Sequence, residues 1–263
     1  MEWLEALILG IVQGLTEFLP VSSSGHIELV KALFGNEIKE GLTLSLTLHL
    51  ATALSTVVIF RKDIVEIFKG LFQFTWNEET KFSWYIVLSM VPAVLVGLLF
   101  KDDIEQLFNA NVPLVCAMLF VTGIVLFWSD QAKNPTGNVT GVKAFIVGVI
   151  QAIAILPGIS RSGSTIGSSV LLGIERSKAA KFSFLMVLPV ILGAAAKDFM
   201  DIRTDGIGDL SVSFLAIAFI SAFVVGIFAC QWMIAIVKQS KLRYFSYYCW
   251  VVAIVGLAWY FLK

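Results

Sequence analysis

Residues 13 to 26 read QGLTEFLPVSSSGH and interrupt an apolar segment that runs from Ala6 to Val30. A second apolar segment, Ala144 to Leu172, is interrupted in the same way by PGISRSGST at residues 157 to 165. Proline and glycine break each segment into two helices of about half the length that crosses a membrane. Irregular backbone at membrane depth is tolerated only where protein or a water-filled cavity covers it. Each break therefore predicts a re-entrant helical hairpin that lines a polar site.

The whole chain has the composition of a membrane protein. Of its 263 residues, 58% are hydrophobic and 14% are charged, whereas about a quarter of an average soluble domain is charged. Six further apolar stretches are long enough, or nearly so, to cross a bilayer as helices. They are Leu42 to Phe60, Phe82 to Phe100, Val112 to Trp128, Phe182 to Ala196, Leu210 to Val237 and Tyr244 to Leu262. The predicted fold class is an all-α polytopic membrane protein with six full transmembrane helices and two re-entrant hairpins.

A single shift of 138 positions relates the two interruptions. It carries Gly10, Gln13, Ser22, Ser24, Gly25, Leu33 and Gly35 onto Gly148, Gln151, Ser160, Ser162, Gly163, Leu171 and Gly173. Chance matching of Gly and Ser is the alternative, but one gapless offset favours duplication. Repeat one then covers about residues 1–130 and repeat two about 140–263 of one integral membrane domain, 1–263. Because three full spans separate the hairpins, the second repeat is expected upside down, as an inverted-topology repeat.

The basic residues predict the orientation. Lys and Arg number 19, as do Asp and Glu, so the net charge indicates no nucleic-acid partner. The face reached by the first span carries Arg61, Lys62, Lys69, Lys81, Lys133, Lys143, Arg176, Lys178, Lys181, Lys238, Lys241 and Arg243, and the opposite face carries Lys31, Lys39, Lys101, Lys197, Arg203 and Lys263. The positive-inside rule makes the first face cytoplasmic and places both termini outside. Hairpins that enter from opposite faces are expected to share one cavity near the midplane.

The first hairpin contains the candidate chemistry. Gln13 and Glu17 are four residues apart and share a helix face. An ionisable residue inside a membrane segment marks a functional site by default, and a Glu that closes a ragged helix end is the alternative. The serines at 22 to 24 precede a short helix, where hydroxyls cap the helix or bind a ligand. His26 is a candidate general acid or base, or a structural hydrogen-bonding group. His49, the other histidine, is interpreted as a supporting or helix-packing group.

The second hairpin contains Arg161, the one permanent cation placed at membrane depth. Its planar guanidinium suits phosphate oxygens, and the helix N-terminus that follows adds N–H donors. These features predict an oxyanion cradle. A ligand-free ion pair between Arg161 and Glu17 is the alternative, and a resting enzyme is compatible with both. Because no Gly-Lys-Ser/Thr loop and no G-x-S-x-G elbow occurs, nucleotide binding and lipase chemistry are disfavoured.

The two motifs together resemble those of the undecaprenyl-pyrophosphate phosphatase family of bacteria, the bacitracin-resistance type, in order and spacing. The similarity extends along essentially the whole chain. It implies a bacterial inner-membrane enzyme that hydrolyses undecaprenyl pyrophosphate to undecaprenyl phosphate and inorganic phosphate. This reaction recycles the lipid carrier of peptidoglycan synthesis and raises tolerance to bacitracin, and the active site is expected to face the periplasm.

The resemblance also implies residue roles. The family's acidic motif maps to Gln13 and Glu17, its Ser-rich stretch to Ser23 and His26, and its arginine motif to Ser160, Arg161 and Thr165. We therefore expect Glu17, Ser23, His26 and Arg161 to be catalytic, and Gln13, Ser22, Ser24, Ser160, Ser162, Gly163 and Thr165 to hold the phosphates. With Gln at position 13, a divalent cation, Mg²⁺ or Ca²⁺, would rest on Glu17 and the substrate oxygens. No organic cofactor is expected.

Several alternatives stay open at this point. The nucleophile is either Ser23, giving a phosphoserine, or a water activated by Glu17. The expected partners are a prenyl pyrophosphate lipid and membrane lipid; the oligomeric state, a homodimer included, is open, as are the metal and the preferred tail length. The competing function is a transporter or flippase of a phosphorylated isoprenoid lipid, because inverted repeats with broken helices are also a transporter architecture.

Overall fold

The computed structural model of the protein describes residues 2–34, 42–107, 111–133, 135–205 and 211–262. Gly35, Lys39, Leu210 and Lys263, which the sequence analysis uses, lie outside these residues. The described residues form twelve helices and, apart from one bridge between Gly137 and Ile174, no strand. The helices are α1 (Glu2–Thr16), α2 (Ser23–Phe34), α3 (Leu42–Ile59), α4 (Arg61–Leu71), α5 (Glu78–Leu99), α6 (Lys101–Leu107), α7 (Val112–Asp130), α8 (Gly141–Ile153), α9 (Arg161–Leu171), α10 (Arg176–Asp205), α11 (Val212–Lys238) and α12 (Arg243–Leu262).

The described helices account for most of the predicted membrane crossings. Five of them, α5, α7, α10, α11 and α12, are long and apolar enough to cross a membrane. The span predicted from Leu42 to Phe60 corresponds to α3, which bends by 76° into α4, and it adds a sixth crossing if the bent pair is one span. The chain is therefore an all-helical, multi-pass membrane protein.

Two pairs of short helices lie where the sequence predicts the hairpins. Helices α1 and α2 have 15 and 12 residues, and α8 and α9 have 13 and 11. A span of the hydrocarbon core needs about 20 residues, so none of these helices crosses it alone. The turn between α1 and α2, residues 17–22, is called turn one below, and the turn between α8 and α9, residues 154–160, is called turn two.

Polar caps set where the long helices begin. The side chains of Asn77, Asn111 and Ser211 accept hydrogen bonds from the backbone N–H three residues later, at 2.8, 3.2 and 3.2 Å. These bonds satisfy N–H groups of the first helical turn, which have no partner inside the helix. The apolar runs that follow can then continue as uninterrupted helices.

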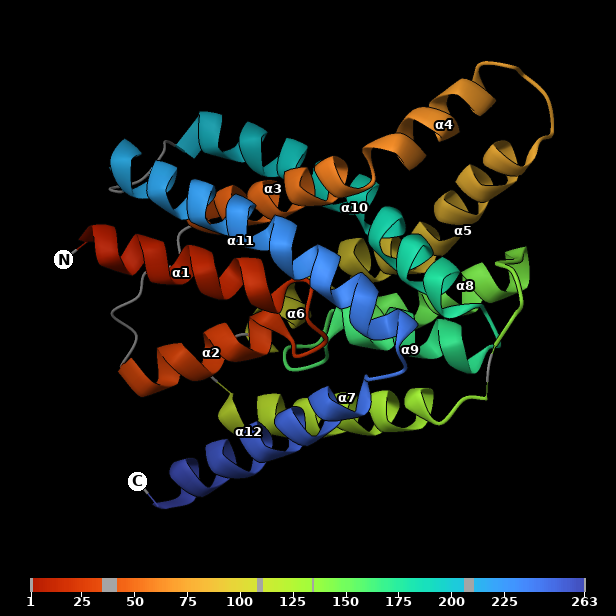
Figure 1. Cartoon of the computed structure of the whole chain (residues 1–263). Coiled ribbons are helices and arrows are strands. Elements are labelled where there is room, and N and C mark those ends of the chain that lie inside the picture. The colour runs from red at the N-terminus through yellow and green to blue at the C-terminus, as the bar shows by residue number, and fades with distance from the viewer. Residues whose placement is uncertain (1, 35–41, 108–110, 134, 206–210, 263) are drawn as a thin grey trace.

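The helices of the two halves of the chain pair crosswise (Figure 1). Helix α1 packs along α11 and α8 along α5, while α3 lies against α10 and α7 against α12. Each pair joins a helix from the first half to one from the second. Glycine allows the closest crossings: a Cβ on Gly10 would lie 1.9 Å from Oγ of Ser221, and a Cβ on Gly148 would lie 2.3 Å from the carbonyl oxygen of Ser89. Such close approach is typical of packed membrane helices.

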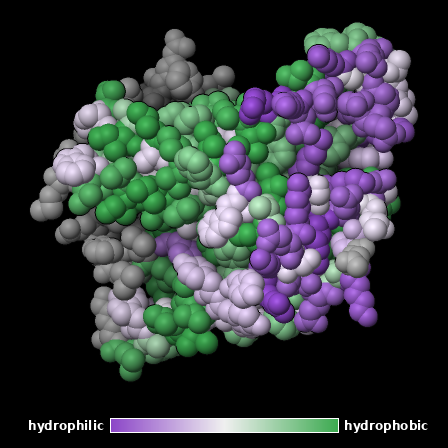
Figure 2. All heavy atoms as spheres, in the orientation of Figure 1, coloured by the Kyte–Doolittle hydropathy of each residue, from purple (hydrophilic) through white to green (hydrophobic). Residues whose placement is uncertain are grey.

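The polarity of the protein is that of a lipid-facing molecule. Apolar side chains cover α1 and α11 on the face drawn in Figure 2, and hydrophilic ones gather around α4 and the connection from α7 to α8. On α11, Ile220 and Phe228 are 60% and 66% exposed. In contrast, residues 162–170 of the Ser-rich helix α9 are all buried. The start of α1 and the end of α12 lie at the same end of the molecule (Figure 1), as the predicted topology requires.

Candidate active site

Turn one and turn two pack against each other at the centre of the molecule (Figure 1). A Cβ on Gly25 would lie 3.0 Å from Cα of Gly158, and a Cβ on Gly163 would lie 3.0 Å from Cβ of Pro20. The shift of 138 positions carries Gly25 onto Gly163 and Pro20 onto Gly158, so these two contacts are equivalent. Gly158 also has φ +96°, a left-handed conformation that favours glycine. The two turns thus build one site from both halves of the chain.

Glu17 and Arg161 form an ion pair across the two turns. Oε1 of Glu17 accepts from the guanidinium, while Oε2 accepts from Nε2 of Gln13 at 3.2 Å and from Oγ of Ser23 at 3.0 Å. The side chain of Glu17 is 6% exposed and that of Arg161 is 22% exposed. The sequence predicts this meeting, because opposite charges inside a membrane are retained as pairs.

The ion pair leaves groups available for chemistry beside both the carboxylate and the guanidinium. The hydroxyl of Ser23 donates to the Glu17 carboxylate, which is the relation between a nucleophile and its general base. On the other side, Nε and Nη1 of Arg161 have no partner in the described part of the chain. A guanidinium can therefore bind phosphate oxygens here without first giving up its carboxylate.

These groups line a cavity of about 390 Å³ between the two turns and α3. The lining residues are Thr16, Glu17, Ser22, Ser23, Ser24, Ser45, His49, Ala154, Ile155, Ile159, Ser160, Arg161 and Ser162. Most of the residues predicted from sequence are among them. Gln13, His26, Gly163 and Thr165 are not; the first three bond to residues of the two turns, and Thr165 bonds to the backbone of Arg161.

The Ser160 and Ser162 hydroxyls of the second hairpin form hydrogen bonds to backbone groups. Ser160 caps α9 by accepting from the N–H of Gly163 at 3.1 Å, and Ser162 donates to the carbonyl of Leu19 at 3.3 Å. Both bonds lie in the buried contact between the turns. They fix the position of the start of α9, whose first residue is Arg161. Direct phosphate contact by Ser160, Ser162 and Gly163 stays a prediction.

Thr165 supports the same helix one turn further on. Its hydroxyl donates to the carbonyl of Arg161 at 2.8 Å, and the hydroxyl of Ser183 on α10 lies 2.5 Å away. Thr165 and Ser183 are 0% and 1% exposed. The observed contacts therefore tie the backbone of Arg161 to α10, and a phosphate contact by Thr165 stays a prediction.

His26 contacts a residue that the sequence does not indicate. Its Nδ1 lies 2.8 Å from the carbonyl oxygen of Ser22, and its Nε2 lies 2.8 Å from the hydroxyl of Tyr248, whose ring stacks on it at 5.6 Å. Because a carbonyl only accepts, Nδ1 carries the proton and Tyr248 donates to Nε2. Both nitrogens of His26 are engaged with protein. Tyr248 is 222 residues away in sequence, so only the fold brings it here.

Two further cavity residues, Ser45 and His49, come from α3. Nδ1 of His49 lies 2.8 Å from the carbonyl oxygen of Ser45. From sequence alone, His49 is predicted to be a supporting or packing residue. The sequence feature that could have indicated a place in the functional site is a titratable side chain in a predominantly apolar span.

The protein donors alone do not make a cation site. Among the described residues, no three His, Cys, Asp or Glu side chains gather as metal ligands. Both oxygens of Glu17 already accept hydrogen bonds. A divalent cation at Glu17 would depend on oxygens of the substrate, and it stays a prediction.

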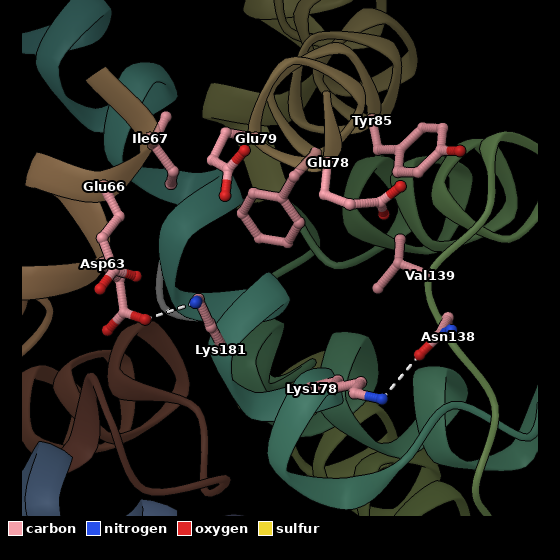
Figure 3. Close-up of a pocket in the computed structure, with 11 residues that line it drawn as sticks. Asp63, Glu66, Ile67, Glu78, Glu79, Tyr85, Asn138, Val139, Lys178 and Lys181 are labelled. Atoms are coloured by element: carbon pink, nitrogen blue, oxygen red, sulfur yellow. Dashed lines mark hydrogen bonds and ion pairs between the residues drawn. The ribbon is translucent and has the colours of Figure 1, made fainter. Parts of the chain in front are cut away.

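A second cavity, of about 240 Å³, lies between α4, α5 and α10 (Figure 3). Lys181 pairs with Asp63, and Nζ of Lys178 donates to Oδ1 of Asn138 at 2.6 Å. Three glutamates add further negative charge to its wall. Since these carboxylates repel anions, an oxyanion is better held in the cavity around Arg161.

Fold and site together define a class: integral membrane proteins that hold a charged polar cavity between two pairs of broken helices. The sequence profile of the bacitracin resistance protein BacA matches residues 6–255, and the chain belongs to this family. It is 53% identical over 264 residues to an undecaprenyl-diphosphatase of Christiangramia forsetii, with 98% of both chains covered. Undecaprenyl-diphosphatases of Bacteroides fragilis and Parabacteroides distasonis are 50% and 49% identical, over 98% and 100% of both chains. The family predicted from the two motifs is confirmed.

Proposed function

We propose that this protein hydrolyses undecaprenyl pyrophosphate to undecaprenyl phosphate and inorganic phosphate. The observation that carries the proposal is the Glu17–Arg161 ion pair with the Ser23 hydroxyl 3.0 Å from the same carboxylate. The names of the relatives supply the substrate. The reaction recycles the lipid carrier of peptidoglycan synthesis, and membership of the bacitracin resistance family links it to tolerance of that antibiotic.

Substrate binding follows from the free donors. The diphosphate enters the cavity, and the unpaired nitrogens of Arg161 bind oxygens of the terminal phosphoryl group. The first N–H groups of α9 lie at the start of a helix and add positive potential there. Charge that develops on the transferring phosphoryl group is stabilised by donors that are already in position.

The chemical step uses Ser23 and Glu17. Oγ of Ser23 attacks the terminal phosphorus as its proton passes to Glu17, and the bond from that phosphorus to the bridging oxygen breaks. The electron pair leaves with undecaprenyl phosphate. Water then attacks the phosphoserine, Ser23 takes the proton back from Glu17, and inorganic phosphate leaves. The contact between Ser23 and Glu17 favours this route over direct attack by water.

The activity is tested on purified protein in detergent. Protein supplied with undecaprenyl pyrophosphate is expected to release inorganic phosphate and undecaprenyl phosphate, with an Arg161→Ala variant of equal monodispersity as the control. A micelle has no two sides, so a protein that only transports the lipid releases no phosphate. Absence of phosphate release from the wild-type protein would overturn the proposal.

The architecture proposed with this function is an inverted repeat whose termini and active-site entrance face the periplasm. Crosswise helix pairing and the two equivalent glycine contacts support the repeat. The distribution of basic residues supports the orientation. Cysteine labelling of the α4–α5 connection in intact cells tests the orientation, and crosslinking in native membranes tests whether the protein forms a homodimer.

A further inference from the structure

The chain contains two histidines, and the structure places them differently. Both nitrogens of His26 are engaged, one by the Ser22 carbonyl and the other by Tyr248. His49 has one nitrogen engaged: Nδ1 lies 2.8 Å from the Ser45 carbonyl, so it carries a proton. Nε2 of His49 makes no hydrogen bond to any residue that the structure describes, and the side chain lines the cavity that holds the ion pair.

The surroundings of His49 suit an anionic ligand. The charged groups that line the same cavity are Glu17 and Arg161, and they are paired with each other. Their charges therefore largely cancel, and an arriving diphosphate supplies the dominant charge beside the imidazole. In the imidazolium form of histidine both ring nitrogens are donors, so Nε2 can donate to a phosphate oxygen while Nδ1 keeps its bond to the Ser45 carbonyl. The Ser45 carbonyl holds the ring so that this nitrogen is the one left for a ligand.

We propose that His49 is a phosphate-binding residue, which donates its Nε2–H to an oxygen of the diphosphate opposite Arg161. The inference rests on the proposed diphosphatase function and adds a third element, α3, to the two turns that hold the substrate. His26, in contrast, contacts protein with both nitrogens, at the Ser22 carbonyl and the Tyr248 hydroxyl, and its catalytic role stays a prediction. Sequence motifs alone would assign phosphate contact to the other histidine.

Binding is measured with a non-hydrolysable probe, the methylene diphosphonate analogue of farnesyl pyrophosphate, by calorimetry in detergent. A charge-assisted hydrogen bond predicts that His49→Leu raises Kd by about 10-fold or more. His49→Gln, whose amide nitrogen replaces Nε2, is expected to stay within about threefold of wild type. Thr16→Val is the matched control, because it removes a hydroxyl of the same wall that donates to the Val12 carbonyl, whereas the Ser45 hydroxyl lies 3.4 Å from Nδ1 of His49. Wild-type affinity in a folded His49→Leu protein would overturn the proposal.

A second readout uses only the native sequence. With ¹⁵N-labelled histidine the protein gives two imidazole patterns, assigned with His49→Gln and His26→Gln. Saturating analogue is expected to move the His49 nitrogens to the imidazolium pattern while those of His26 change little. An unchanged His49 pattern at saturation would refute the inference. Neither measurement requires turnover, so a wild-type protein that binds the analogue but releases no phosphate contradicts the proposed function and leaves the role of His49 standing.

Discussion

Turn one and turn two have related sequences, but their polar side chains make different kinds of interaction. In turn one the side chains of Glu17 and the adjoining Ser23 face the cavity and each other. In turn two the hydroxyl of Ser160 caps the helix that it starts, and that of Ser162 just beyond it holds the backbone of turn one. The first hairpin thus provides the predicted reacting groups, and the second fixes a guanidinium beside them. Similar sequences in the two hairpins therefore serve different roles in the site.

The repeat positions make the comparison specific. The shift of 138 carries Ser23 onto Arg161, and each is the first residue of its helix. Both bind the carboxylate of Glu17, one at each oxygen. Glu17 itself corresponds to Ile155, which lines the same cavity without a polar atom. A single acid is therefore bound by the two positions that the shift of 138 relates.

Removing the guanidinium at the start of α9, next to turn two, is expected to have the largest effect. Arg161→Ala should lower kcat/KM about 1,000-fold or more, because no other described cation lines the cavity. Arg161→Lys should restore little, since an ammonium lacks the planar fork. Phosphate release is measured alongside Lys178→Ala, a control in the second cavity that is expected to behave as wild type. An active Arg161→Ala protein would mean that turn two is not the anion cradle.

The equivalent change at the start of α2, next to turn one, separates the two chemical routes. Ser23→Ala should lower kcat about 100-fold or more if Ser23 is the nucleophile. Ser24→Ala, at a neighbouring hydroxyl of the same cavity, is the control and should cost far less. Acid-quenched wild-type protein with substrate labelled in the terminal phosphate should carry label on Ser23. Full activity of Ser23→Ala would favour the water route.

A change in the support of turn two should act mainly on stability. Thr165→Ala removes a buried hydroxyl that bonds the Arg161 carbonyl and leaves Ser183 without this partner. The expected cost is about 1–3 kcal/mol of unfolding free energy, with a smaller loss of activity than Arg161→Ala. Thr165→Ser should recover most of the stability and most of the activity. Thermal unfolding and phosphate release are measured on the same samples. A loss of activity with no loss of stability would instead indicate that Thr165 contacts the phosphate directly.

The smallest effects concern the two equivalent glutamines. Gln13 donates to Glu17, so Gln13→Leu should lower activity by about 10-fold. The amide of Gln151, 4% exposed, makes no hydrogen bond to the residues that the structure describes. Burying an unpaired amide costs free energy, so Gln151→Met should leave activity unchanged and not lower the unfolding temperature. If both variants lose activity equally, the division between the turns is weaker than the structure indicates.

Much of the fold follows from sequence because the membrane restricts the choices. Apolar length predicts the long helices, and the Pro and Gly breaks predict the hairpins. The meeting of Glu17 and Arg161 follows from the cost of isolated charges in lipid. The use of each hydroxyl does not follow, since Ser and Thr serve equally as caps, packing groups or ligands. The contact of His26 with Tyr248 depends on the packing of α12, and the place of His49 in the cavity wall depends on the packing of α3, neither of which a local sequence pattern predicts.

The crosswise pairing of helices has a consequence for assembly. Neither half can complete its own core, because α1 needs α11 as its neighbour and α8 needs α5. A gene cut between α7 and α8 should yield fragments that are degraded when made alone but reconstitute an active enzyme when made together.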